Sequence, residues 1–184
     1  MSINSTAAYR GTLPRFTLDG FFSGPLVASG VFCDRKRRVR NRFFMNMLGN
    51  WEGKRGTLEE RFTFLDDQGN SSHAERVWKL EQIDERNFRG TAAGSAGDIV
   101  GIAEGSAEGY AMHWQYTVRQ PVGDKAYNLR TDDRMYLLGP QHVINHSRMH
   151  FFGFFVGEAI IEIHRLGADE LDAVRGHPRP ETYR

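Results

Sequence analysis

The chain of 184 residues contains a single cysteine, Cys33, and only 6 prolines. A lone cysteine excludes an intrachain disulfide and a metal site built from several cysteines. A membrane-spanning helix needs about 18 consecutive apolar residues. No segment provides them, since glycines and Glu158 interrupt even the apolar segment 151–163. The first 13 residues are polar and lack the apolar core of a signal peptide, so the sequence predicts a cytoplasmic protein.

An excess of charge of one sign is also missing, because 24 Lys and Arg residues oppose 23 Asp and Glu residues. Such a balance creates no overall field that attracts nucleic acid, and no nucleic-acid partner is expected. The chain has no phosphate-cradling loop and no dinucleotide fingerprint, so no cofactor is expected. Segment 93–97 (AGSAG) lacks the leading glycine of a nucleophile elbow, and no serine nucleophile is predicted.

Glycine and phenylalanine are plentiful, at 20 and 13 residues. Short segments that alternate apolar and polar residues are separated by turn residues throughout the chain. This pattern predicts an all-β fold, a single antiparallel up-and-down barrel of about nine or ten strands. The expected strands are 26–33, 39–48, 57–65, 74–83, 87–92, a glycine-rich strand that includes 101–107, and then 111–120, 126–138, 142–151 and 154–165.

The barrel domain is expected to span residues 16–166. A flexible arm, 1–15, precedes it, and a short helix with a disordered tail, 167–184, follows it. Segment 16–22 is predicted to form a helical turn whose apolar side chains plug the core. Segment 49–56, with its three glycines, is predicted to be a turn.

The glycine-rich strand presents Gly101, Ala103, Gly105 and Ala107 on one face, which is left nearly bare. Such a face either allows a neighbouring element to pack closely or leaves empty room inside a barrel. The sequence alone leaves both alternatives open.

Four polar residues fall on strand faces that are otherwise apolar and are therefore predicted to point inward: Glu60, Arg76, Asp133 and Asn145. An unpaired charge in such a place is costly, so Glu60 and Arg76 are expected to pair if their strands face each other. Two interpretations remain: an ion-pair network that fixes the register, or a polar handle for the head group of an amphipathic ligand. The candidate ligand-binding residues are Glu60, Arg76, Trp78, Tyr127, Asp133, Met135, Asn145 and Met149.

Three histidines, His142, His146 and His150, recur every four residues. On a helix they would suit a metal ion, but four residues of a strand span about 13 Å, too far for one ion. We therefore predict no metal site and place the histidines on an exposed face. His113 is a candidate general base, although a structural role is the stronger interpretation.

Segment 35–42 carries six basic residues: Arg35, Lys36, Arg37, Arg38, Arg40 and Arg42. The plainer interpretation is a solvated hairpin tip. The alternative is a weak contact with an anionic membrane surface.

Four segments together resemble motifs of a known family: 75–80 (ERVWKL), 112–118 (MHWQYTV), 132–138 (DDRMYLL) and 143–149. The family is an uncharacterised bacterial one, lipocalin-like (calycin-type), a domain of unknown function with many lipoprotein members. The resemblance covers about residues 17–165 and implies a barrel that binds a lipid or another hydrophobic molecule. It transfers no catalytic residue. This chain departs from the pattern in lacking a lipoprotein signal and in having Arg134 where an aromatic residue is usual.

The sequence thus favours a binding protein that holds a hydrophobic or amphipathic small molecule, fatty-acid or lipid-like, in the barrel interior without chemistry. One alternative is an enzyme that acts on a lipid-like substrate with an interior carboxylate or His113 as acid or base. Another is an interaction module that docks through the basic segment 35–42. The pattern leaves the oligomeric state open.

Overall fold

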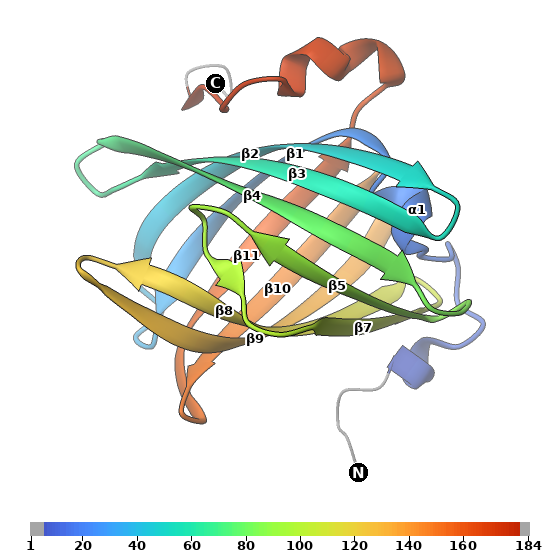
Figure 1. The fold of residues 1–184 in the computed structure, drawn as a ribbon, viewed down its shortest axis with the longest axis horizontal. Coiled ribbons are helices and arrows are strands. Elements are labelled where there is room, and N and C mark those ends of the chain that lie inside the picture. Colours follow the sequence, from blue (N-terminus) through green and yellow to red (C-terminus); the bar gives the residue numbers. More distant parts are fainter. Residues whose placement is uncertain (1–5, 181–184) are drawn as a thin grey trace.

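A computed structural model describes residues 6–180 of the chain. Ten of its strands form a closed antiparallel barrel, and consecutive strands are also neighbours in the sheet (Figure 1). β11 returns to pair with β1, and the short β6 pairs with one end of β8 beside the barrel. The strands are β1 (Gly24–Asp34), β2 (Val39–Glu52), β3 (Arg55–Leu65), β4 (Ser71–Gln82), β5 (Asn87–Ala93), β6 (Asp98–Ile99), β7 (Ala103–Glu108), β8 (Ala111–Val122), β9 (Lys125–Gly139), β10 (His142–Phe151) and β11 (Phe154–Arg165). The predicted up-and-down barrel is confirmed.

Burial alternates along the strands as the sequence pattern requires. In β9, Thr131, Asp133, Met135 and Leu137 are buried, whereas the residues between them are partly exposed. Successive side chains of a strand point to opposite faces, so one face of β9 lines the core. The core therefore occupies the inside of the barrel.

The helix α1 (Leu18–Phe21) closes one end of the barrel (Figure 1). Thr17 caps it, because its hydroxyl accepts a hydrogen bond from the Gly20 backbone N–H at 3.1 Å. Leu18 and Phe21 are buried. The indole N–H of Trp51 donates to the Phe22 carbonyl at 2.7 Å and ties this plug to the wall.

Segment 49–56 is not the expected turn, because β2 and β3 extend through it and leave only Gly53 and Lys54 between them. Trp51 stands directly opposite Gly56 across the two strands. A Cβ atom at Gly56 would overlap the indole ring. Gly56 thus makes room for a tryptophan inside the ladder, which the turn prediction missed.

The glycine-rich strand packs closely instead of leaving empty room. A Cβ atom at Gly105 would overlap the rings of Phe88 and Trp114, so only glycine fits between them. Ala103 is fully buried nearby. Gly101 lies outside β7 with a φ of 76°, a backbone conformation that glycine adopts without strain.

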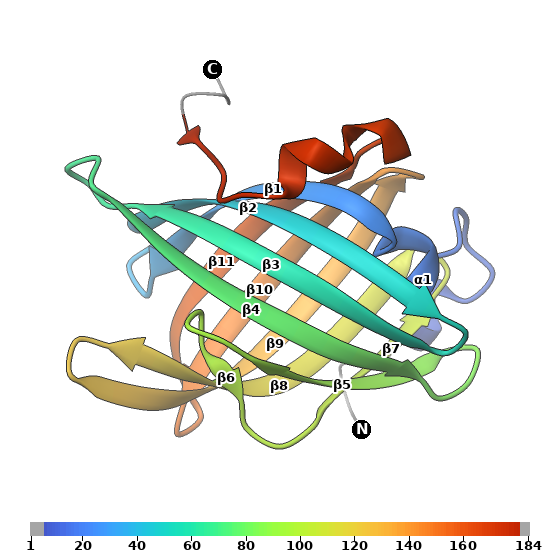
Figure 2. The same cartoon turned by 45° about the horizontal axis from the view of Figure 1, so that its top comes forward.

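The first and the last residues that the structure describes both lie against the barrel. Residues Thr6–Tyr9 form a 3-10 helix (η1), and the Tyr9 ring packs on Tyr110 with centroids 5.2 Å apart. A second 3-10 helix, η2 (Ala168–Val174), lies over β1 and β2 (Figure 2, red). The residues after η2 contact β3, because the Thr63 hydroxyl donates a hydrogen bond to the Pro178 carbonyl at 2.7 Å.

These contacts differ from the free arm and disordered tail that the polar terminal sequences suggested. The rest of those expectations, for residues 1–5 and 181–184, lies outside the described residues. No helix within residues 6–180 is long and apolar enough to cross a membrane.

Candidate functional site: a cavity inside the barrel

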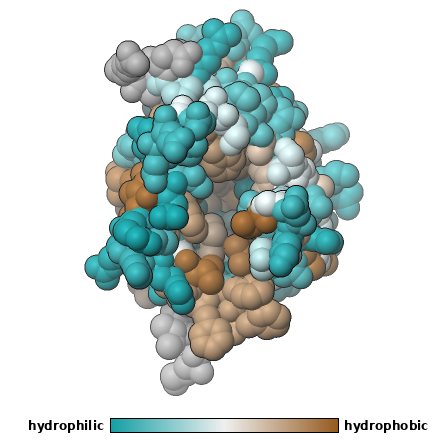
Figure 3. Space-filling model, turned by 90° about the vertical axis from the view of Figure 1, so that its left-hand side faces the viewer, coloured by the Kyte–Doolittle hydropathy of each residue, from teal (hydrophilic) through white to brown (hydrophobic). Residues whose placement is uncertain are grey.

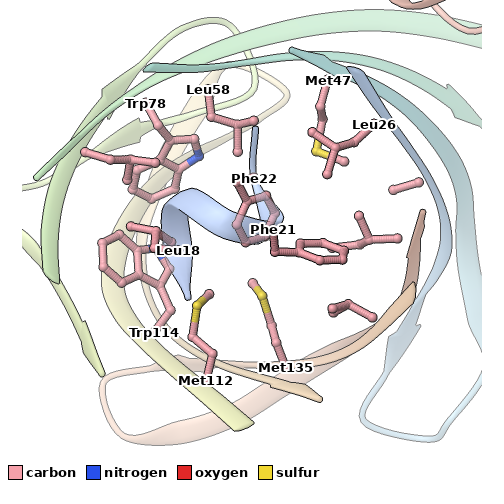
Figure 4. Packing of buried hydrophobic residues seen from close by; sticks show 14 of the residues in the cluster. Leu18, Phe21, Phe22, Leu26, Met47, Leu58, Trp78, Met112, Trp114 and Met135 are labelled. Carbon is pink, nitrogen blue, oxygen red and sulfur yellow. The ribbon is translucent and has the colours of Figure 1, made fainter. Parts of the chain in front are cut away.

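The barrel encloses a cavity of about 540 Å³. It extends from Leu18 and Phe22 at the plugged end to Pro121 and Val122 near the β8–β9 hairpin. Figure 4 shows Leu58, Trp78, Met112 and other apolar side chains pointing inward around α1, among the residues that line it. The opposite end of the molecule is visibly hollowed, with hydrophobic atoms around the depression (Figure 3).

Two charged residues meet in the cavity wall. Glu60 and Arg76 are direct cross-strand partners on β3 and β4, and Arg76 Nε donates to Glu60 Oε2 at 2.8 Å. The guanidinium group also lies over the Phe62 and Trp78 rings, 5.6 and 5.2 Å from their centroids. The expected pair therefore forms, and each charge has the partner that its burial requires.

A second polar group, centred on Asp133, lies in the same wall. The Tyr116 hydroxyl donates to Asp133 Oδ2 at 3.0 Å, and Ser147 stands directly opposite Asp133 on β10. Burial raises the pKa of Asp133 to about 6, although the neighbouring Ser147 and Tyr116 hydroxyls and the charge of Arg76 lower it. This carboxyl group therefore changes its protonation state close to neutral pH.

The two groups influence each other electrostatically. Burial has the largest single effect on the pKa of Arg76 and lowers it, but Glu60, Tyr116 and Asp133 together outweigh burial and raise that pKa, so Arg76 stays charged. Burial and the negative charge of Asp133 raise the pKa of the Tyr116 phenol well above its ordinary value. Tyr116 is therefore a neutral hydrogen-bond donor to the carboxylate.

Two buried acceptor atoms in the wall lack a protein donor. Asp133 Oδ1 and Asn145 Oδ1 form no hydrogen bond with any residue in the described part of the chain. Buried polar atoms are nearly always hydrogen-bonded, and a buried atom without a partner costs about 1–3 kcal/mol. Both atoms belong to residues that line the cavity, so a donor group of a bound molecule can satisfy them.

The structure brings together most of the residues that the sequence singled out. Those that line the cavity are Glu60, Arg76, Trp78, Asp133, Met135, Asn145 and Met149. Tyr127 is not among the lining residues, because its ring packs on Phe151 with centroids 5.6 Å apart. Tyr116 and Ser147 were missed, because only their places beside Asp133 distinguish them from other wall residues.

The candidate base His113 does not line the cavity. Its neighbours Met112 and Trp114 do, so the alternation of β8 turns His113 outward, where its Nε2 lies 3.0 Å from Asp132 Oδ2. Burial would raise the pKa of Asp132, but hydrogen bonds from His113 and Gln115 lower it below its ordinary value. The two adjacent aspartates thus lie in opposite electrostatic environments.

The three spaced histidines do not meet one another. His146 Nε2 lies 2.8 Å from Glu158, and the His150 ring packs on Phe155. His142 instead stacks on His164 of β11, with ring centroids 4.1 Å apart.

A closed up-and-down barrel with a largely apolar internal cavity is the architecture of a lipocalin-like barrel. The chain belongs to the family described as a protein of unknown function (DUF3833), whose model matches residues 1–165. Among solved structures it is similar to the S-type phycobiliprotein lyase CPES from Guillardia theta, with a TM-score of 0.55 and 9% identity. The match covers 79% of this chain and 88% of that one, and at this identity it shows the fold alone. No curated protein matches the chain.

Proposed function

We propose that this protein binds a hydrophobic or amphipathic small molecule, fatty-acid or lipid-like, inside the barrel and performs no chemistry on it. The observation that carries the proposal is the cavity of about 540 Å³ with apolar walls and one cluster of polar side chains. Pockets for small molecules measure about 300–1,000 Å³ and combine apolar walls with a few orienting polar groups.

The polar cluster favours a head group that donates a hydrogen bond. Asp133 Oδ1 and Asn145 Oδ1 are acceptors without a donor among residues 6–180. Arg76, the cation in this wall, is already paired with Glu60 at 2.8 Å, so it adds little attraction for an anionic head group. A hydroxyl group or a protonated carboxyl group fits these partners better than a carboxylate does.

Native mass spectrometry of the purified protein tests the proposal directly, because a co-purified lipid adds a defined mass. Tryptophan fluorescence provides a second readout, since Trp78 and Trp114 line the cavity while Trp51 is bonded to the plug. In a Trp51→Phe variant, oleyl alcohol or oleic acid is expected to change the emission saturably. The alcohol is expected to bind more tightly at neutral pH.

The matched control is Ala159→Phe, which places a ring in the cavity from β11. This variant is expected to lose the fluorescence response while circular dichroism shows that the barrel remains folded. An unchanged response in this variant would place the lipid outside the cavity and contradict the proposal.

One observation favours the enzyme alternative. Asp133 lines the cavity, and burial raises the pKa of its carboxyl group to about 6, a range suited to acid or base catalysis near neutral pH. Incubation of a bound lipid with the protein and with Asp133→Asn, followed by mass spectrometry, distinguishes the two functions. A product that forms only with unsubstituted protein would make the barrel an enzyme, whereas an unchanged ligand supports binding alone.

We further propose that the protein contacts an anionic membrane surface, from which the ligand enters the barrel. The β1–β2 and β10–β11 hairpins lie at the end of the barrel away from α1. The first hairpin carries Arg35, Lys36 and Arg37, and the second exposes 85% of Phe152 and 76% of Phe154. Cations beside exposed aromatic rings are suited to the interface of an anionic bilayer.

Sedimentation with phosphatidylcholine vesicles, with and without phosphatidylserine, tests this contact. Binding is expected only with phosphatidylserine, and it should weaken with salt and in an Arg35→Glu/Arg37→Glu variant. Equal binding to both kinds of vesicle would refute a contact driven by the basic hairpin. Because ligand binding is measured separately by tryptophan fluorescence, failure here leaves the ligand-binding proposal standing.

A further inference from the structure

Two histidines and a glutamate meet on the outer face of the barrel, away from the cavity. His142 on β10 and His164 on β11 are direct cross-strand partners, and Glu162 precedes His164 by two residues on the same face. The adjacent Val143 and Ile163 are buried on the other face, so the three polar side chains point outward. This cluster lies outside the lining of the cavity.

The three side chains converge on a small volume. The histidine rings stack with centroids 4.1 Å apart and an interplanar angle of 20°. Glu162 Oε1 lies 2.9 Å from His142 Nε2 and 2.8 Å from His164 Nε2. One donor atom from each residue lies within 4.8 Å of the other two. Within residues 6–180 no other His, Cys, Asp and Glu group meets this condition.

The Nε2 atom of His142 is buried, and its 2.9 Å contact with Glu162 lacks the geometry of a hydrogen bond in the described part of the chain. Buried polar atoms nearly always have a partner, and a metal ion held by the three side chains would give this nitrogen one.

We propose that His142, Glu162 and His164 form a binding site for a divalent transition-metal ion of the zinc class. Imidazole nitrogen and carboxylate oxygen are ligands that bind Zn²⁺ at about 2.0–2.2 Å. Small side-chain rotations bring donors separated by at most 4.8 Å around one such ion. Three protein ligands leave a coordination position for water or another ligand.

The backbone and the neighbouring strands both suit this site. Residues 162 and 164 present two ligands from one strand face, and the pairing of His142 with His164 adds the third from the next strand. Val27 on β1 stands opposite His164, and Gly139 on β9 stands opposite His142. Neither neighbour is a cation, so no positive side chain directly opposes the ion.

Two other histidine clusters serve as internal controls. His146 lies 2.8 Å from Glu158 on the same two strands, which provides only one histidine and one carboxylate. The rings of His73 and His177 pack in a tilted arrangement with centroids 4.6 Å apart near Glu75, but among the described residues they do not form a metal-ligating group. Variants of His146 and His177 therefore report on nonspecific binding to surface histidines.

Isothermal titration of the full chain, without an affinity tag, with Zn²⁺ alone tests the proposal. One ion per chain is expected. Removing a residue that only hydrogen-bonds a metal-binding side chain lowers metal affinity by about 10–100-fold. Removing a side chain that binds the metal itself should therefore lower the affinity at least about tenfold. His142→Ala, His164→Ala and Glu162→Gln should each weaken binding to this extent, whereas His146→Ala and His177→Ala should leave it unchanged.

The visible absorption spectrum of the Co²⁺ form provides a second measurement that does not depend on affinity. Glu162→Gln is the mildest substitution and is expected to shift this spectrum while circular dichroism stays constant. Absence of Zn²⁺ binding to the unsubstituted chain would overturn the proposal. Equal binding by His164→Ala and the unsubstituted chain would overturn it as well, because the ion would then lie elsewhere.

Discussion

Asp132 and Asp133 are adjacent residues with opposite effects on the pH dependence of stability. Burial raises the pKa of Asp133 from 3.8 to about 6, so the folded protein resists its ionisation. As the pH rises from about 4 to 6, this group lowers the free energy of unfolding by on the order of 3 kcal/mol. The pKa of Asp132 is lowered in the folded protein, so Asp132 stabilises the fold above pH 4, and this effect is lost as the pH falls.

We therefore expect Asp133→Asn to be more stable than the unsubstituted protein at pH 7.5, with the difference shrinking toward pH 4.5. Asp132→Asn, the matched control, is expected to be less stable at pH 7.5. Urea unfolding at the two pH values measures both differences. A stability change for Asp133→Asn that does not depend on pH would contradict the burial of an ionisable carboxyl group.

Glu60 and Arg76 permit a test of the buried ion pair. Removing one member leaves the other charge buried without its partner, which costs about 3–5 kcal/mol, whereas apolar replacement of both is often nearly neutral. Arg76→Met is therefore expected to lower the free energy of unfolding strongly, and Glu60→Leu/Arg76→Met to restore most of the loss. Chemical denaturation of the two single variants and the double variant completes the cycle. Additive losses would show that the 2.8 Å contact contributes no coupling.

At the scale of elements, the plug α1 is held by close backbone contacts. A Cβ atom at Gly49 would overlap the carbonyl group of Phe22, the same oxygen that accepts the Trp51 N–H. Gly49→Ala should displace the plug, lower the free energy of unfolding by about 1–3 kcal/mol, and shift Trp51 emission toward that of a solvated indole.

Gly139→Ala is the control, because nothing lies within 4 Å of the position that a Cβ atom would take there, and the φ of Gly139 is ordinary. Its stability is expected to stay equal or rise slightly. An equal loss of stability in both variants would show that the close approach at Gly49 does not matter.

The strands and their inward faces could be predicted because their signal is local. A period of two fixes which residues share a face, and that was enough to place Glu60, Arg76, Asp133 and Asn145 in the wall. Register between strands adjacent in sequence was partly predictable as well, since a hairpin brought Glu60 opposite Arg76.

What could not be predicted depends on neighbours that the chain order does not reveal. The sequence around Trp51 predicts a turn, and only the cross-strand pairing with Gly56 shows that Trp51 belongs to a strand. The same holds for the histidines, because their spacing along β10 suggested one group while the pairing with β11 formed another. The polar terminal segments carry no period, so nothing in them indicates that Thr63 bonds Pro178.

For the whole molecule, the cavity links ligand binding to stability. Side chains around an unfilled cavity forgo packing contacts, and a ligand that restores them stabilises the folded state alone. At a free concentration of about 100 times Kd a ligand adds roughly 2.7 kcal/mol. For a chain of this length that raises the melting temperature by roughly 5–10 °C.

Oleyl alcohol is therefore expected to raise the melting temperature of the unsubstituted protein by this amount, as measured by differential scanning calorimetry. Ala159→Phe fills the space from within, so its melting temperature should respond little to the same ligand. The comparison separates binding in the cavity from binding at the exposed Phe152 and Phe154, which the Ala159 substitution leaves untouched. If both proteins responded equally, the exposed rim of the barrel, and not its interior, would be the place where lipid binds.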